Sequence, residues 1–327
     1  MPDGLLFDVA GDSDNEPDTA DSGAGFDPAL NEVIEAIKEK GRGSLAGRFG
    51  QVFRRSVDEI LDGRRTRRYD FLDEKVANVE RSYLGAKAEI LAREEFDFGH
   101  GVDLDYLIAG HEVDAKFSAT GDWMIAPKNV GKICLVMQAS EDTSRFSVGV
   151  VRAQPDLLRP KATRDSKRSF RAAAKVSIRW LVREAEYPRN QLMELRRADV
   201  NAVNAIFASS SSGQKRVNEL FRRLQQTLVN RTTVQTVASQ EDSSKRVRDA
   251  RLDLRDEGIL ILGYQRQHRE IAKALGLPGI SQGEWASVRV CPAEVGDIQP
   301  VFRLGGVEYR MAGPDDQPHK APELPRE

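Results

Sequence analysis

The chain has 327 residues, 40% of them hydrophobic and 31% charged, which is typical of a soluble globular protein with two domains. It has no run of eighteen apolar residues and begins with acidic rather than basic residues, so we expect neither a membrane-spanning segment nor a signal peptide, and a cytoplasmic location. Cys134 and Cys291 are far apart and no Cys/His cluster has zinc spacing, so the thiols are expected to be buried and reduced.

The net charge of −2 conceals an uneven distribution along the chain. Residues 1–30 hold eight acidic side chains and no Lys or Arg, and this Gly-, Pro-, Ser- and Asp-rich segment is predicted to be a disordered acidic tail. Residues 31–314 hold 39 acidic and 47 basic side chains, a charge of +8. Such a basic body suits a polyanionic partner, although an arginine-rich surface without a ligand gives the same count. Residues 315–327 are expected to form a flexible tail.

Helical spacing of apolar residues runs from Asn31 to Asp62, with interruptions at glycines. The segment Ile60–Arg68 resembles the motif of nucleotidyl ligases, in which a lysine is followed by x-Asp-Gly. Ile60 occupies the position of that lysine, and without the amine no adenylate can form, so a ligase is excluded at this motif. What remains is a basic turn, suited either to phosphate contacts or simply to solvent.

A long helix is predicted from about Asp73 to Glu95. Its apolar side is expected to hold Val76, Val79, Tyr83, Leu84, Ile90 and Leu91. Glu89 falls near the border of this face, but periodicity does not choose between it and the other acidic residues of the helix, Glu80, Glu94 and Glu95.

The segment Asp103–Phe117 alternates apolar and polar residues on either side of Ala109-Gly110-His111, which predicts two strands joined by a tight turn. Side chains two apart on a strand share a face, so Asp114 and Lys116 are expected to point the same way, with Asp105 close by on the paired strand. Two carboxylates beside a lysine can hold a divalent cation and activate water for attack on a phosphodiester. The alternative is a surface hairpin with an ion pair.

Two further segments, residues 131–138 and 146–151, are apolar enough to be buried strands. Helix, hairpin and central strands together predict an α/β layer over residues 31–182. A linker is expected at 183–188, before a region of different architecture.

The second region shows three helices, at about 216–229, 232–239 and 243–256, followed by a strand at 259–262. Near the end, residues 301–310 form a predicted hairpin around the glycine pair 305–306. This order predicts a winged helix-turn-helix domain over residues 189–314, whose third helix would enter the DNA major groove. A helical core with a basic, solvated face is the alternative.

The third of these helices is expected to bury Val247, Ala250 and Leu254. Its opposite side carries the candidate DNA-binding residues Ser244, Lys245 and Arg248, flanked by Arg251 and Arg255.

At this point the residues show a family resemblance. The chain resembles the NaeI-type restriction endonucleases from the Asp62-Gly63 segment to the hairpin at Tyr309, most closely over Asp103–Phe117, Lys132–Val136, Lys215–Arg223 and Lys245–Gly263. The resemblance implies a nuclease domain with the restriction-endonuclease fold and a C-terminal winged-helix domain like that of catabolite activator protein. It also implies type IIE behaviour, in which a second copy of the recognition DNA acts as an effector.

The resemblance selects Glu89, Asp105, Asp114 and Lys116 as the catalytic residues. It implies that Asp105 and Asp114 are Mg²⁺ ligands and that Glu89 supports the metal or its waters, while Ala115 offers only its carbonyl oxygen. Lys116 would orient the attacking water and stabilise charge in the transition state.

The expected function is therefore Mg²⁺-dependent, site-specific cleavage of double-stranded DNA to 5′-phosphate ends, in a bacterial restriction–modification system. A homodimer is expected because a palindromic site matches two-fold symmetry. Two alternatives stay open: a winged-helix regulator with an inactive nuclease-like domain, and a DNA repair nickase.

Overall fold

The computed structural model describes residues 27–208, 212–240, 242–294 and 296–324. Almost all of the predicted acidic tail, residues 1–26, therefore lies outside the described residues. Residues 27–30 are the exception: the Asp27 carboxylate accepts a hydrogen bond from the Leu30 backbone and caps the first helix, which begins at Pro28. No helix among the described residues has the length and apolar character needed to cross a membrane.

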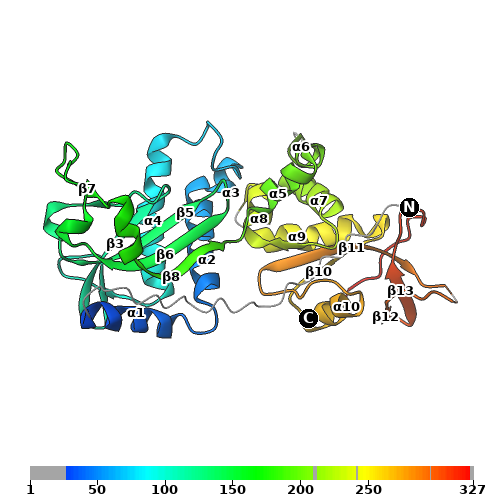
Figure 1. Ribbon diagram of the computed structural model, residues 1–327. Helices are drawn as coiled ribbons and strands as arrows, with labels where there is room; N and C mark the ends of the chain where they lie inside the picture. Colours follow the sequence, from blue (N-terminus) through cyan, green and yellow to red (C-terminus); the bar gives the residue numbers. More distant parts are fainter. Residues whose placement is uncertain (1–26, 209–211, 241, 295, 325–327) are drawn as a thin grey trace, which may run out of the picture.

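The first half of the chain is built on a six-stranded sheet (Figure 1). The strand order is β1-β2-β3-β5-β6-β8, in which only the β3–β5 pair is parallel. The sheet is mixed because residues 119–132 carry the chain from the end of β3 back to the edge where β3 began, so that β5 starts there and runs parallel to β3. Its strands are β1 (Gly99–His100), β2 (Tyr106–Ile108), β3 (His111–Ser118), β5 (Ile133–Ser140), β6 (Arg145–Arg152) and β8 (Arg179–Glu186).

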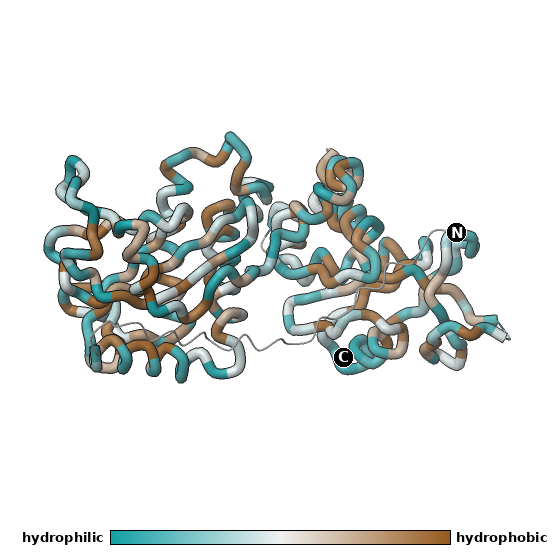
Figure 2. The backbone as a smooth tube through the Cα atoms, in the orientation of Figure 1, coloured by the Kyte–Doolittle hydropathy of each residue, from teal (hydrophilic) through white to brown (hydrophobic). Residues whose placement is uncertain are grey.

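Each face of this sheet buries its own apolar cluster. Helices α1 (Pro28–Lys40), α2 (Leu45–Leu61) and α4 (Asn78–Glu95) cover one face, where their side chains pack against Leu135 and Phe146. The other face is covered by β4 (Met124–Ile125), β7 (Arg168–Ser169) and three short 3₁₀ helices, η1 (Pro127–Asn129), η2 (Pro155–Leu157) and η3 (Ala172–Ser177). The central strands β5 and β6 are therefore apolar on both faces, as predicted, and form the brown interior of Figure 2.

The apolar side expected for the long helix was only partly right. α4 begins at Asn78, later than predicted, and buries Leu84 and Leu91 together with Ala88 and Ala92. Val79 and Tyr83 are each 62% exposed, because the first turns of α4 project beyond the sheet and meet solvent. Ile90 is also exposed.

The second half begins with helices and ends in a second sheet. Its helices are α5 (Gln191–Ala198), α6 (Val200–Ala208), α7 (Gly213–Arg223), α8 (Arg231–Ala238), α9 (Ser243–Asp253) and α10 (Arg266–Ala274), with a 3₁₀ turn η4 (Arg255–Glu257) after α9. Its strands are β9 (Leu228–Asn230), β10 (Ile259–Leu262), β11 (Glu284–Pro292), β12 (Val301–Leu304) and β13 (Val307–Met311). β11 is the long central strand, and β10 pairs alongside its middle.

The hairpin predicted at residues 301–310 is confirmed as β12–β13, with Gly305 and Gly306 at positive φ in its turn. It pairs with the last residues of β11, whereas β9 pairs with the first. The hairpin therefore lies at the opposite end of this sheet from β9 and α8, and the connection between β10 and β11 contains α10 instead of a simple wing (Figure 1).

Three boundaries differ from expectation. β8 continues to Glu186, so most of the expected linker at 183–188 is strand, and the connection to α5 is residues 187–190. α7 ends at Arg223, because the chain turns there into β9. The C-terminal segment from 315 to 324 is not a loose tail. Ala321 is buried and its N–H donates to the Arg255 carbonyl, and the Asp316 carboxylate accepts hydrogen bonds from both Nη atoms of Arg310.

The segment that resembles a ligase motif forms a contact between the two halves. Asp62 ends α2 in the left-handed conformation, and the short helix α3 (Gly63–Thr66) follows. Gly63 lies so close to α8 that a Cβ there would be 2.2 Å from Thr236 Oγ1. Nearby, the rings of Tyr69 and Phe207 stack with centroids 5.4 Å apart. Glycine is therefore needed here for a close approach between the halves.

Candidate active site

The predicted hairpin is confirmed and sets the frame of the candidate active site. β2 and β3 pair antiparallel, with Tyr106 opposite Val113 and Ile108 opposite His111. Ala109 and Gly110 form the two-residue turn, both with positive φ, which is the twist that such hairpins favour. Val113 and Ala115 are fully buried on one face of β3, so Asp114 and Lys116 share the other, as predicted.

The four predicted catalytic residues come from three elements and approach each other. Asp105 lies one residue before β2 rather than within it, and its Oδ2 accepts a hydrogen bond of 2.7 Å from the Ala115 backbone. The ammonium of Lys116 lies 2.5 Å from Asp114 Oδ1 and 2.9 Å from the carbonyl oxygen of Ala115. Glu89 approaches from α4, close enough for the charges of Asp105, Asp114 and Lys116 all to influence it.

The electrostatics of these carboxyl groups reflect burial and crowding. Burial, together with the negative charge of Asp105, raises the pKa of Glu89 to about 7, against an opposing effect of Lys116. Burial also raises the pKa of Asp114, which is only 3% exposed, although Lys116 and Asn129 stabilise its charged form. When Glu89, Asp105 and Asp114 are all ionised, the site therefore carries more negative charge than the single charge of Lys116 neutralises.

One buried neighbour of Asp114 was not predicted from the sequence. Asn129, at the end of η1, donates a 2.8 Å hydrogen bond from Nδ2 to Asp114 Oδ2 and is 5% exposed. Its Oδ1 is buried with no hydrogen-bond partner among the described residues. The thiol of Cys134 lies on the same side, 3.9 Å from Asp114 Oδ2. The sequence signal for Asn129 was weak, since a single asparagine after Pro127-Lys128 reads as part of a loop.

The donor set suits a hard divalent cation better than zinc. Across the described ranges, no three His, Cys, Asp or Glu side chains are already gathered as a metal cage. The oxygens of Asp114, Asp105 and the Ala115 carbonyl are nevertheless the ligand types that Mg²⁺ prefers. Two of these oxygens, Asp114 Oδ1 and the Ala115 carbonyl oxygen, already face the positive charge of the Lys116 ammonium.

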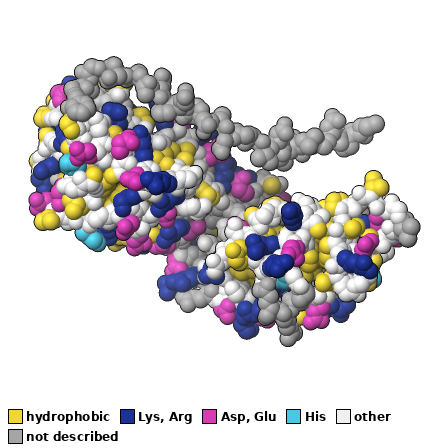
Figure 3. Space-filling view, turned by 90° about the horizontal axis from the view of Figure 1, so that it is seen from below, with side chains coloured by type: hydrophobic (Ala, Val, Ile, Leu, Met, Phe, Trp, Pro, Cys, Tyr) yellow, Lys and Arg dark blue, Asp and Glu magenta, His cyan; other side chains and the backbone are white. Residues whose placement is uncertain are grey.

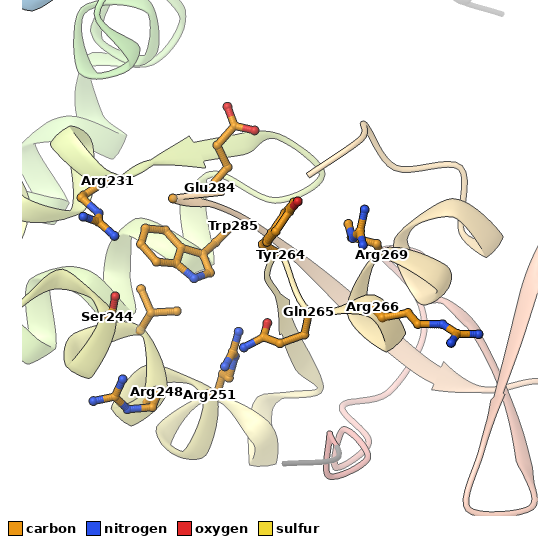
Figure 4. Close-up of a pocket in the computed structure, with 12 residues that line it drawn as sticks. Arg231, Ser244, Arg248, Arg251, Tyr264, Gln265, Arg266, Arg269, Glu284 and Trp285 are labelled. Atoms are coloured by element: carbon orange, nitrogen blue, oxygen red, sulfur yellow. The ribbon is translucent and has the colours of Figure 1, made fainter. Parts of the chain in front are cut away.

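The residues predicted to bind DNA on the third helix divide into two groups. Ser244, Arg248 and Arg251 line one hollow, which is drawn in Figure 4. Lys245 is exposed outside that hollow and pairs with Asp249 at 3.2 Å. The helix was predicted to reach Asp256, but α9 ends at Asp253, and the 3₁₀ turn that follows directs Arg255 to the Ala321 carbonyl and Glu323 of the C-terminal segment.

The surface charges are mixed on the face of the molecule that is drawn in Figure 3. On the face seen in Figure 3, Lys and Arg side chains alternate with Asp and Glu instead of forming one continuous basic area. Both cysteines are buried and unpaired, as predicted.

Comparison with known proteins places this chain among the restriction endonucleases. The family described as "Restriction endonuclease NaeI" matches residues 32–319, so the chain belongs to that family and the resemblance seen in the sequence is confirmed. In particular, the chain is similar to the type II restriction enzyme NaeI of Lentzea aerocolonigenes. The two are 38% identical over 284 residues, which is 84% of this chain and 88% of the relative.

Proposed function

We propose that the chain is a type II restriction endonuclease that hydrolyses double-stranded DNA at a specific site, with Mg²⁺ as cofactor and 5′-phosphate ends as products. Family membership supports site-specific DNA cleavage. The observation that carries the proposed chemistry is the Lys116 ammonium held against Asp114 Oδ1 and the Ala115 carbonyl, beside Asp105. A lysine and paired carboxylates on one hairpin are the groups that phosphodiester hydrolysis requires.

In this proposal Asp105, Asp114 and the Ala115 carbonyl would hold Mg²⁺, and the bound ion would supply positive charge that stabilises the charge added to the scissile phosphate. The water oxygen attacks phosphorus, and the bond from phosphorus to the 3′-oxygen breaks, which leaves a 5′-phosphate and a 3′-hydroxyl. Lys116 orients the water and stabilises negative charge on the phosphoryl oxygens.

Glu89 is suited to a supporting role in this chemistry. A carboxyl group with a pKa of about 7 exchanges its proton near neutral pH. Glu89 would therefore hydrogen-bond a water molecule in the site or accept the proton that the attacking water loses.

The second half of the chain is proposed to be a winged-helix DNA-binding domain. Its helices and strands follow the order of that fold, which is α7, β9, α8, α9, β10 and β11. Both β9 and β10 pair with β11. α9 would then be the helix that reads DNA, with Arg248 exposed on its outer side. The β12–β13 hairpin, at the far end of β11, would be an addition to the fold.

We also propose that this domain binds a second DNA duplex as an effector. The close contact of Gly63 with Thr236 joins the segment after α2 to α8, which directly precedes α9. Binding at α9 can therefore bias the position of α2 and the nuclease half, with a coupling energy of about 1–3 kcal/mol if it is typical of allosteric proteins. A homodimer, proposed because its two-fold symmetry would match a palindromic site, would place two hairpin sites on the two strands.

Supercoiled plasmid incubated with the protein and Mg²⁺ tests the activity. Discrete linear fragments are expected. Nicked circles without linear product would identify a nickase, and intact plasmid with retained binding would identify a regulator.

A further inference from the structure

The hollow beside α9 is lined by arginines from several elements. Figure 4 shows Arg231 at the start of α8, Arg248 and Arg251 on α9, and Arg266 and Arg269 on α10, arranged around Trp285 at the start of β11. The guanidinium groups of Arg231 and Arg251 point toward the indole, whereas Arg248 and Arg266 extend outward. A concave surface with this concentration of one charge attracts anions more strongly than a flat one.

Several of these arginines have no carboxylate partner. Among the described residues, no Asp or Glu forms an ion pair with Arg231, Arg248 or Arg251, whereas Arg266 pairs with Glu270. Glu284 also lines the hollow, but it is a single carboxylate against five lining arginines. The hollow therefore has a surplus of positive charge.

Arg251 is held in place despite this surplus. Its Nε donates to the Ile261 carbonyl at 2.9 Å, and burial with the adjacent charge of Arg248 lowers its pKa to about 10. Gly263 leaves the necessary space, because a Cβ there would lie 2.9 Å from Arg251 Nη2. A bound anion would relieve both the desolvation and the repulsion between the two guanidinium groups.

Arg269 is likewise positioned for a ligand. Its guanidinium stacks over the ring of Tyr264, with 4.7 Å between the carbon of the guanidinium and the ring centroid. Stacking leaves the edge of the guanidinium free to bind a phosphate through two parallel hydrogen bonds. Arg231, exposed at the start of α8, lies at the opposite rim of the same hollow.

We propose that this hollow binds the phosphates of a DNA strand beside the groove that α9 enters, with Arg231 and Arg269 as phosphate ligands outside the reading helix. The proposal rests on the proposed DNA binding by α9 and extends it. It assigns DNA contact to α10, an element in the β10–β11 connection, and to the first residue of α8. It also assigns Arg251 to the phosphate site and leaves Arg248 for the bases.

The test is the salt dependence of binding, measured with the full-length protein, a labelled short duplex and no divalent metal. Each lost phosphate contact should reduce the slope of log K against log salt by about 0.9. Between 50 and 200 mM salt, the affinity of Arg231→Gln or Arg269→Gln should therefore fall about 3.5-fold less than that of the native protein. Arg269→Lys, which keeps the charge, should restore most of the slope.

Lys273→Gln is the matched control, because Lys273 is exposed on α10 and does not line the hollow. Its slope should be native. If Arg248→Ala weakens binding while Arg231→Gln and Arg269→Gln behave like Lys273→Gln, the phosphate site is refuted and DNA binding by α9 stands. If Arg248→Ala also has no effect, DNA binding by this domain fails as well. Stabilisation of the native protein by inorganic phosphate, with native DNA slopes in the Arg231 and Arg269 variants, would identify a free-anion site and overturn the proposal.

Discussion

Replacing Glu89 by glutamine should stabilise the metal-free protein at alkaline pH while impairing cleavage. Burial beside Asp105 raises the pKa of Glu89 from 4.5 to about 7, so the folded protein binds this proton more tightly than the unfolded chain. The free energy of unfolding therefore falls as the pH rises from the pKa of Glu89 in the unfolded chain to its pKa in the folded protein. The interval corresponds to roughly 3 kcal/mol, at about 1.4 kcal/mol for each pKa unit. The Glu89→Gln variant does not lose this free energy, because glutamine stays neutral at every pH.

The assay is urea denaturation of the native protein and Glu89→Gln in EDTA, at about pH 5 and about pH 8. The difference in unfolding free energy between the two proteins should grow by roughly 2 to 3 kcal/mol between those pH values, in favour of the variant. Glu94→Gln, at an exposed position on the same helix, controls for loss of a helix charge and should show no such growth. A pH-independent difference for Glu89→Gln would mean that the carboxyl group is ionised without penalty, and would refute the crowded site described here.

Three further predictions concern the two proposed sites. Asp114→Ala and Lys116→Ala should each abolish Mg²⁺-dependent cleavage with DNA binding largely kept; appreciable cutting by either would remove the hairpin from the active site. Asn129→Ala removes the hydrogen bond that orients Asp114 Oδ2 and stabilises its charged form, so it should raise the Mg²⁺ concentration for half-maximal cleavage and weaken Mg²⁺ binding measured by calorimetry. Cys134→Ala should change neither, and equal metal affinity in both variants would assign Asn129 to packing alone. Arg248→Ala should weaken DNA binding by about 1–3 kcal/mol if it contacts a base, and remove the acceleration of single-site cleavage by an added uncleavable duplex. An acceleration that survives in this variant would contradict an effector site at α9.

The strand elements were predictable because their patterns are local. Alternation around the Ala109-Gly110 turn was enough to place Asp114 and Lys116 on one face of β3, and the apolar runs of β5 and β6 marked buried strands. Helix faces were less predictable. Val79 looks like a core residue by spacing, yet it is exposed because the start of α4 extends past the sheet, which no local pattern reveals.

The site residues that the sequence missed are those brought together only by tertiary structure. Asn129 reaches Asp114 from a 3₁₀ helix fifteen residues away, and Glu89 could be chosen only through the family resemblance. Arg231 and Arg269 join α9 from separate elements, so no single helical pattern includes them. The end of the third helix was predicted at Asp256, but α9 ends at Asp253, and the 3₁₀ turn that follows directs the side chain of Arg255 toward the C-terminal segment.

The β2–β3 hairpin is proposed to cut double-stranded DNA at one sequence. The most direct measurement is to sequence both ends of every fragment produced from a plasmid in Mg²⁺ by the native protein and by Lys116→Ala. The native protein should give ends that all fall within one recurring sequence, carry 5′-phosphates and ligate without treatment, and the variant should give none. Ends scattered over unrelated sequences, or the same ends from Lys116→Ala, would contradict the claim.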